Sequence, residues 1–170
     1  MNIKRDLKEG CTIWFTGLPG SGKTTLAMVL EKKLKDNGRQ VERLDGDTVR
    51  KSLTRDLGFT EEDRKMNIER VTFVAKLLSR NRVMTLASFI SPYISSREHA
   101  RKETTNFIEV FVKCPLEVCM ERDVKGMYKK ALKGEIKNFT GVSHPYEEPP
   151  SPEIVVETDK MSIEECVDAI

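Results

Sequence analysis

The eight residues from Gly17 to Thr24 constrain this chain more than any other stretch of its sequence. They read Gly-Leu-Pro-Gly-Ser-Gly-Lys-Thr and satisfy every fixed position of the pattern G-x-x-x-x-G-K-[ST]. The apolar run 12–15 before them is typical of a buried parallel strand, and residues 25–30 after them suit a helix. The sequence therefore predicts a loop that joins a strand to a helix N-terminus, which is a place where phosphate groups bind.

Each part of this loop has a predicted role in holding a nucleoside triphosphate. The glycines allow positive φ angles, so that backbone N–H groups can point at a phosphate chain. Lys23 supplies a positive charge for the β- and γ-phosphates, and the hydroxyl of Thr24 is a candidate Mg²⁺ ligand. The predicted nucleotide-binding residues are Gly17, Leu18, Pro19, Gly20, Ser21, Gly22, Lys23, Thr24 and Thr25.

Length and composition favour one soluble globular domain, residues 1–170, with 38% apolar and 33% charged residues. A net charge of +2 is too small to indicate nucleic acid or a membrane surface as a partner. No apolar run is long enough to span a membrane, and residues 1–6 lead into no signal-peptide core. The four cysteines lack metal-binding spacing, so we interpret them as reduced thiols of a cytoplasmic protein.

Apolar runs and helical patterns alternate along the chain. We expect strands at 12–15, 40–44, 82–89, 107–112 and 154–157, and helices at 25–30, 60–79, from 95, at 116–122 and at 162–170. Segment 125–135 has too few apolar positions to be core, and 143–152, with four prolines, must be a loop. The alternation implies right-handed crossovers. It predicts the three-layer α/β fold of P-loop nucleoside triphosphatases, with a mostly or wholly parallel sheet.

The carboxyl ends of the strands define the expected site, because ligands of parallel α/β sheets bind there. Segments 45–47 and 88–92 follow strands and bring the carboxylates of Asp45 and Asp47, with two serine hydroxyls, to the same edge as the loop. Such carboxylates could orient Mg²⁺-bound water or accept a proton from an attacking hydroxyl, as phosphoryl transfer requires. Asp and Gly also favour turns, so a purely structural role stays open.

Basic residues beyond this edge are candidate ligands of a phosphorylated substrate. Arg50, Arg64 and Arg70 lie on helices leading away from it, and Arg64 shares a helix face with Asn67. Taken singly, each arginine could equally be a solvated surface residue. The basic segment 124–141 is a candidate lid that would exclude water, with lysines that could neutralise charge on the transferred group. An ordinary exposed helix is the alternative.

Further motifs resemble those of adenylylsulfate kinases, which use ATP to phosphorylate the 3′-hydroxyl of adenosine 5′-phosphosulfate. The resemblance runs from about Gly10 to Thr158 without a large gap, and the family's fold class agrees with the one predicted from the strand pattern. The matching segments are 44–47, 56–59, 62–64, 67–68, 87–93, 107–111, 125–131 and 134–141.

The resemblance implies ATP with Mg²⁺ as the phosphate donor and gives roles to single residues. Lys23 would stabilise charge, Asp47 would act near the 3′-hydroxyl as base or orienter, and Asp45 would support Mg²⁺ with Thr24. Ser91 matches a serine regarded in this family as a phosphoenzyme site, although direct in-line transfer needs no covalent step. Phe139 would stack on the substrate adenine, and Phe59 lies in a loop that could cover it. The implied substrate-binding residues are Asp47, Arg50, Arg64, Asn67, Ile90, Ser91, Lys125, Phe139 and Thr140.

Two positions depart from the family, since Glu69 and Ile94 stand where arginines are usual, and this would weaken the hold on an anionic substrate. Two other functions stay open. One is another small-molecule kinase, of the sugar or shikimate type. The other is a non-catalytic nucleotide-binding regulatory domain, against which the intact Lys23 and Asp47 argue. Expected partners are the small-molecule substrate, a second copy in a homodimer and, functionally, ATP sulfurylase.

Overall fold

A computed structural model describes residues 10–170 of the chain. Residues 1–9, which include the segment 1–6 discussed above and the start of the predicted domain 1–170, lie outside the described part. Five parallel strands form one sheet in the order β2-β3-β1-β4-β5. The strands are β1 (Thr12–Thr16), β2 (Val41–Asp45), β3 (Met84–Ser88), β4 (Phe107–Lys113) and β5 (Ile154–Glu157). The predicted parallel sheet is therefore confirmed.

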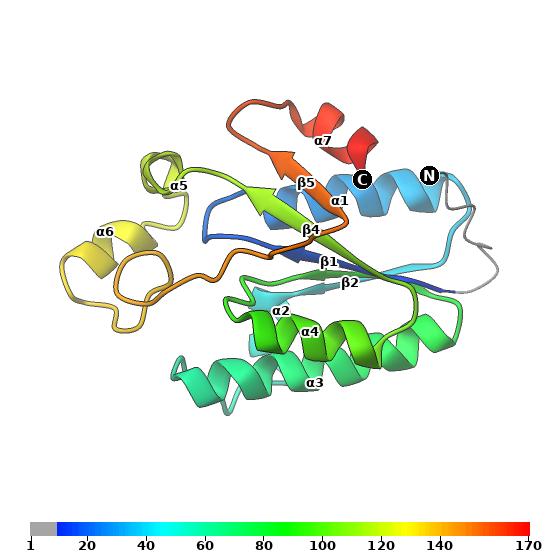
Figure 1. The fold of residues 1–170 in the computed structure, drawn as a ribbon, viewed down its shortest axis with the longest axis horizontal. Coiled ribbons are helices and arrows are strands. Elements are labelled where there is room, and N and C mark those ends of the chain that lie inside the picture. Colours follow the sequence, from blue (N-terminus) through cyan, green and yellow to red (C-terminus); the bar gives the residue numbers. More distant parts are fainter. Residues whose placement is uncertain (1–9) are drawn as a thin grey trace.

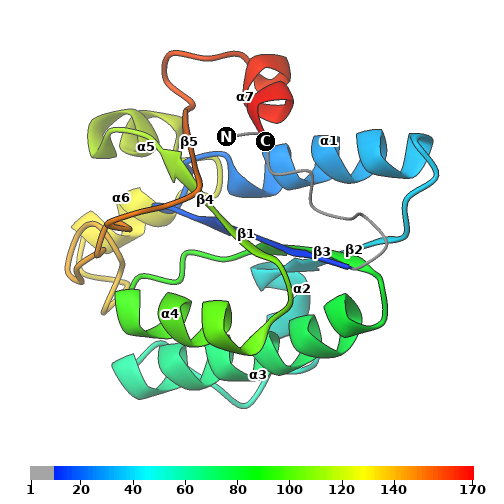
Figure 2. The ribbon, with the colours of Figure 1, turned by 45° about the vertical axis from the view of Figure 1, so that its right-hand side comes forward.

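Helices cover both faces of this sheet, which gives the predicted three layers (Figures 1 and 2). On one face lie α1 (Lys23–Asp36) and α7 (Ile163–Ala169), and on the other α3 (Glu61–Arg80) and α4 (Ile94–Glu103). Of three short helices, α2 (Gly46–Arg50) follows β2, α5 (Leu116–Arg122) follows β4, and α6 (Met127–Leu132) follows α5. Among the helices of residues 10–170, none combines the length and apolar character needed to cross a membrane.

Local sequence signals explain where several helices begin. The hydroxyl of Thr60 accepts a hydrogen bond from the backbone N–H of Asp63, which caps α3. Ser162 and Glu165 form a reciprocal capping box at the start of α7. Asp45 caps α2, because its carboxylate accepts the N–H of Asp47. Asp45 is thus the last residue of β2, and Gly46 and Asp47 begin a short helix.

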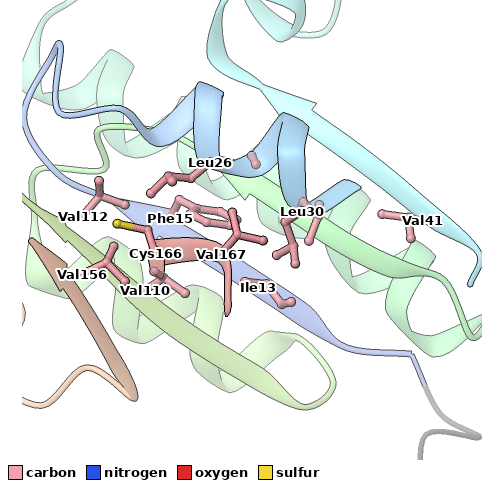
Figure 3. Packing of buried hydrophobic residues seen from close by; sticks show 12 residues of the cluster. Ile13, Phe15, Leu26, Leu30, Val41, Val110, Val112, Val156, Cys166 and Val167 are labelled. Carbon is pink, nitrogen blue, oxygen red and sulfur yellow. The ribbon is translucent and has the colours of Figure 1, made fainter. Parts of the chain in front are cut away.

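The alternation of side chains along the strands divides the core into two layers. Phe15 of β1 lies with Leu26 and Leu30 of α1 and Val167 of α7 on one face (Figure 3). On the other face Trp14 packs between Phe89 and Phe107, with ring centroids 5.9 and 6.0 Å away. The five side chains of β1 are all buried, so the phosphate loop starts from a strand that is covered on both faces.

A third, smaller core lies beyond the carboxyl ends of the strands. Tyr128 and Ala131, three residues apart on α6, are buried together with Phe139, Cys114 and Cys119. The expectation that segment 125–135 contributes nothing to a core is therefore wrong. Its two buried residues lie on one helix face, and a short basic segment gives too little periodicity to reveal that face.

Arg97 of α4 is the most deeply buried charged residue among residues 10–170 and is 2% exposed. Its guanidinium group donates to the carboxylate of Glu109 at 2.8 Å, to the carbonyl of Ser91 at 2.6 Å and to the carbonyl of Glu147 at 2.7 Å. One side chain thus joins β4 to two loops that are distant in sequence. Removing it would leave Glu109 and two carbonyls without partners inside the protein.

We therefore expect Arg97→Met to lower the free energy of unfolding by about 3–5 kcal/mol, the usual effect of breaking a buried ion pair. Urea denaturation followed by circular dichroism would measure it. Lys32→Met is a suitable control, since Lys32 pairs with Asp36 on the exposed surface of α1 and such pairs contribute little. Equal denaturation midpoints for the two variants would contradict the assignment.

Candidate active site

The phosphate loop connects β1 to α1 at the carboxyl edge of the sheet. Gly17, Gly20 and Gly22 have φ angles of 153°, 77° and 101°, so the predicted positive φ values are confirmed. A Cβ atom at Gly17 would lie 2.5 Å from the carbonyl oxygen of Val112, and therefore no larger residue fits there. No side chain caps the N-terminus of α1, which leaves its backbone N–H groups available to an anion.

Lys23 lies over this loop and is 9% exposed. Its ammonium group donates to the carbonyl oxygens of Gly17 and Leu18, at 2.9 and 2.7 Å. Burial lowers the pKa of Lys23 to about 8, an effect that the nearby Cys119 and Asp45 partly offset. Bound phosphates would supply the negative charge that this buried lysine lacks in its present surroundings.

Thr24 and Asp45 form the pair of oxygen ligands that the sequence predicted for Mg²⁺. The Thr24 hydroxyl donates to the Asp45 carboxylate at 2.8 Å, which fixes the first turn of α1 against the end of β2. Within residues 10–170 no three His, Cys, Asp or Glu side chains gather into a metal site. Magnesium usually takes one or two carboxylates, with water and substrate phosphates completing its shell. A single carboxylate beside a hydroxyl and a phosphate loop therefore fits that ion.

Asp47 lies two residues further, in the first turn of α2, and is exposed. Its carboxylate forms an ion pair with Lys125, from the segment between α5 and α6. The structure thus brings together the predicted base and a predicted lysine of segment 124–141, although 78 residues separate them in the sequence. Both side chains are more than half exposed, so solvent screens this pair.

Two of the three candidate arginines meet around one aromatic ring. The guanidinium carbons of Arg50 and Arg64 lie 4.3 and 5.6 Å from the centroid of Phe59. Arg64 also donates to the carbonyl of Asn138 at 2.6 Å, which links α3 to the segment before Phe139. Burial lowers the pKa of both arginines, although an arginine remains protonated in proteins.

Asn67 and Arg70 have structural contacts that the sequence did not reveal. The side-chain oxygen of Asn67 accepts a hydrogen bond from the Thr54 hydroxyl at 2.8 Å, so this buried residue already has a partner in the segment after α2. Arg70 makes a bidentate pair with Asp56, at 2.7 and 2.9 Å. Arg70 therefore fixes the segment after α2 and is not drawn into the group formed by Arg50 and Arg64.

The segment after β3 has a constrained backbone at Ser91, where φ is +40°. The Ser91 hydroxyl is 1% exposed, accepts a hydrogen bond from the Trp14 indole at 3.0 Å and donates to the carbonyl of Phe89 at 3.3 Å. The carbonyl of Ile90 accepts from the Thr16 hydroxyl at 2.8 Å. Ser91 is thus held by the core in a position where its hydroxyl proton already has an acceptor.

Phe139 and Thr140 lie at the end of the predicted lid and are both buried. The ring of Phe139 is 7% exposed and packs edge-to-face against Tyr128, with centroids 5.0 Å apart. A base could stack on this ring only if the segment around it moved. The predicted stacking role of Phe139 therefore stays a prediction.

Three residues to which the sequence analysis gave no role, Tyr128, Arg122 and Thr158, connect α6 and α5 to the phosphate loop. The Tyr128 hydroxyl donates to the carbonyl of Pro19 at 2.8 Å. Arg122 donates to the carbonyl of Thr158 at 2.7 Å, and the Thr158 hydroxyl donates to the carbonyl of Ser21 at 2.8 Å. No spacing or periodicity marks these residues, because their partners are backbone carbonyls on remote segments.

Tyr146, from the proline-rich loop, is the fourth residue that the sequence analysis missed. Its hydroxyl lies 2.9 Å from that of Thr16, directly before the phosphate loop, and its ring stacks on Phe111. Burial raises the pKa of Tyr146 to about 12, so its phenol stays protonated at neutral pH. The phenol can therefore donate to Thr16, whose own proton goes to Ile90.

The fold and the site together define a P-loop kinase: a parallel sheet, a glycine loop with Lys23 and Thr24 after its central strand, and a carboxylate pair at the next strand end. The chain belongs to the adenylylsulphate kinase family, whose sequence model matches residues 9–157.

Individual relatives agree with this membership. The chain is 66% identical over 161 residues to a probable adenylyl-sulfate kinase of Pseudomonas aeruginosa, covering 95% of this chain and 75% of that protein. It is 57% identical over 163 residues to the adenylyl-sulfate kinase of Halothermothrix orenii, covering 96% and 88%. The structure superimposes on the APS kinase of Mycobacterium tuberculosis in complex with AMPPNP and APS, with a TM-score of 0.91, 43% identity and 94% of each chain covered.

The buried charge of Lys23 gives a prediction on stability. We expect Lys23→Met to raise the free energy of unfolding of the nucleotide-free protein at pH 7 by about 1–3 kcal/mol, because it removes a desolvated ammonium group. In the wild type the folded pKa is about 8 and the ordinary value 10.5. The folded state therefore loses this proton first as pH rises, and the penalty fades between those values.

Urea denaturation at pH 7 and at pH 10 would measure this effect. The advantage of Lys23→Met should be largest at pH 7 and nearly gone at pH 10. Lys133→Met, at an exposed position, should show no such difference. A pH-independent advantage, or a loss of stability at pH 7, would contradict the prediction.

Proposed function

We propose that this protein transfers the γ-phosphoryl group of ATP to the 3′-hydroxyl of adenosine 5′-phosphosulfate, giving 3′-phosphoadenosine 5′-phosphosulfate. The chain belongs to the adenylylsulphate kinase family. The observation that carries the proposal is that the phosphate loop, the Thr24–Asp45 pair and Asp47 all lie at one edge of the sheet. The loop provides the donor site and Asp47 the proton acceptor. A sugar or shikimate-type kinase would give no reason for Phe139 or for the residues expected to bind the phosphosulfate. A regulatory domain would not need an intact Lys23 and Asp47.

On the donor side, backbone N–H groups of residues 17–25 and the α1 N-terminus would hold the phosphates of ATP. The Lys23 ammonium group would leave the carbonyls of Gly17 and Leu18 and turn to the β- and γ-phosphates. Thr24 and Asp45 would hold Mg²⁺, which when bound neutralises charge that develops on the phosphoryl oxygens. No covalent chemistry is required of any of these groups.

On the acceptor side, the carboxylate of Asp47 would take or steer the proton of the ribose hydroxyl. That hydroxyl is far too weak an acid to ionise at neutral pH, so a positioned carboxylate would accept its proton while the phosphoryl group is transferred. Lys125 stands beside this carboxylate and would come close to the transferred group. The guanidinium groups of Arg50 and Arg64 around Phe59 provide the positive charge for a phosphosulfate.

The remaining substrate-binding roles rest on the shape of the loops. The backbone at Ile90 and Ser91 would line the acceptor pocket, since Thr16 and Arg97 fix it from below. Asn67 would support Arg64 from within α3, and Phe139 with Thr140 would close the pocket from the lid. A homodimer, a functional coupling to ATP sulfurylase and a cytoplasmic location also stay predictions.

A mass-resolved assay tests the proposed function. The protein is incubated with ATP, Mg²⁺ and adenosine 5′-phosphosulfate, and in parallel with gluconate, shikimate and adenosine 5′-monophosphate as acceptors. We expect one phosphoryl group to be added to the phosphosulfate and its turnover to exceed that of every other acceptor. Faster transfer to a sugar or to shikimate would contradict the substrate assignment, and nucleotide binding without any transfer would favour the regulatory alternative.

The two aspartates are expected to fail in different ways. Asp47→Asn keeps the shape but removes the proton acceptor, so turnover should fall at least about a hundred-fold, the low end of general base catalysis. Its affinity for ATP should change only a few-fold. Asp45→Asn should instead raise the Mg²⁺ concentration needed for half-maximal rate. Steady-state kinetics over a Mg²⁺ series separates the two, and the reverse pattern would mean that the roles are exchanged.

Ser91 tests whether a phosphoenzyme takes part. Because its hydroxyl is buried between Trp14 and Phe89, we expect Ser91→Ala to keep substantial transfer activity, within about ten-fold of the wild type, since it loses one neutral hydrogen-bonding group. Quench-flow with radiolabelled ATP would show whether the enzyme itself becomes labelled. A stoichiometric phosphoserine at this position, formed and consumed at the turnover rate, would overturn direct transfer.

A further inference from the structure

Ser88, the last residue of β3, has a buried hydroxyl that the mechanism above does not use. The residue is 3% exposed, and its Oγ atom has no hydrogen-bond partner within residues 10–170. A buried hydroxyl without a partner destabilises a protein, and an ordered water or ion that completes its hydrogen bonding is one explanation for it. The residues next to Ser88 therefore indicate what could bind there.

The strand register places Ser88 beside Asp45. The two residues are direct partners in the parallel pairing of β2 with β3, and adjacent strands lie about 4.8 Å apart. Leu86 and Val41 belong to the core below α1 (Figure 3 labels Val41). Since side chains alternate along a strand, Ser88 and Asp45 lie on that same face.

Helix α1 covers this face of the sheet and brings Thr24 beside Asp45. This residue is in the first turn of α1, and its bond to the Asp45 carboxylate measures 2.8 Å. Three oxygen-bearing side chains, of Thr24, Asp45 and Ser88, therefore meet at the carboxyl edge of the sheet. Two of them are bonded to each other, and the third is buried with no partner in the described chain.

We propose that Ser88 is the third polar residue of the magnesium site, where its hydroxyl holds a water molecule of the hydrated ion. This inference rests on the proposed function, because that function requires Mg²⁺. Magnesium gives up its water reluctantly and usually keeps several molecules of it, so a protein site must hydrogen-bond that water. A partner that orients a ligand of the ion affects metal affinity without touching the ion itself.

Thr85, three residues earlier on β3, provides a matched control. It is also fully buried with an unpartnered hydroxyl in the described structure. However, it lies on the opposite face of the sheet from Ser88, since their positions differ by an odd number of residues. Thr85→Val removes a buried hydroxyl from the same strand at nearly constant volume, away from the Thr24–Asp45 pair.

The test measures Mg²⁺ dependence apart from catalysis. Isothermal titration gives the affinity for ADP over a Mg²⁺ series and in EDTA, for the wild type, Ser88→Ala, Ser88→Cys and Thr85→Val. We expect both Ser88 variants to raise the half-saturating Mg²⁺ concentration by about three- to ten-fold, the effect of losing one hydrogen bond. Their ADP affinity in EDTA should stay within about two-fold, and Thr85→Val should match the wild type throughout.

The cysteine variant fills the space that alanine would leave, so a destabilised alanine variant does not decide the result. An unchanged Mg²⁺ dependence in the cysteine variant would overturn the proposal, as would an equal shift in Thr85→Val. The wild type separates this inference from the function on which it rests. If wild-type nucleotide binding does not respond to Mg²⁺, the proposed function is wrong. If the wild type responds and the Ser88 variants show the same Mg²⁺ dependence as the wild type, only the role of Ser88 is wrong.

Discussion

The hydroxyl of Thr16 joins three segments at the point where β1 ends and the phosphate loop begins. It donates to the carbonyl of Ile90 and lies 2.9 Å from the hydroxyl of Tyr146. Since β1 is buried on both faces, this position cannot shift without disturbing the core. The phosphate loop, the segment after β3 that contains Ile90, and the proline-rich segment that contains Tyr146 are therefore all fixed at Thr16. Arg97 of α4 adds hydrogen bonds to the last two of these segments.

Helices α5 and α6 are attached to the phosphate loop by hydrogen bonds to its backbone. Tyr128 of α6 donates to the carbonyl of Pro19, and Thr158 links Arg122 of α5 to the carbonyl of Ser21. Tyr128 also belongs to the small core with Phe139. A movement of α6 would therefore affect both the phosphate loop and Phe139, the predicted adenine-binding residue.

The sequence predicted most of the fold because that part depends on local signals. Apolar runs located every strand, the caps at Thr60 and Ser162 located two helices, and the glycine loop located the donor site. The errors, and residues such as Tyr146, have a common physical origin. A hydrogen bond between two hydroxyls 130 residues apart in the sequence, such as that of Tyr146 with Thr16, leaves no trace in hydrophobic periodicity. The same holds for the partnerless hydroxyl of Ser88, which only the strand register places beside Asp45.

The ion pair between Asp47 and Lys125 has a consequence for the order of events at this edge. Both partners are largely in water, so the bond is weak and its ammonium group can change partners readily. A phosphate chain that arrives in the loop competes with the carboxylate for that single cation. When the phosphate wins, the Asp47 carboxylate is released from Lys125 and can accept a hydrogen bond from a substrate hydroxyl. One lysine thereby couples the availability of this carboxylate to the filling of the neighbouring anion site.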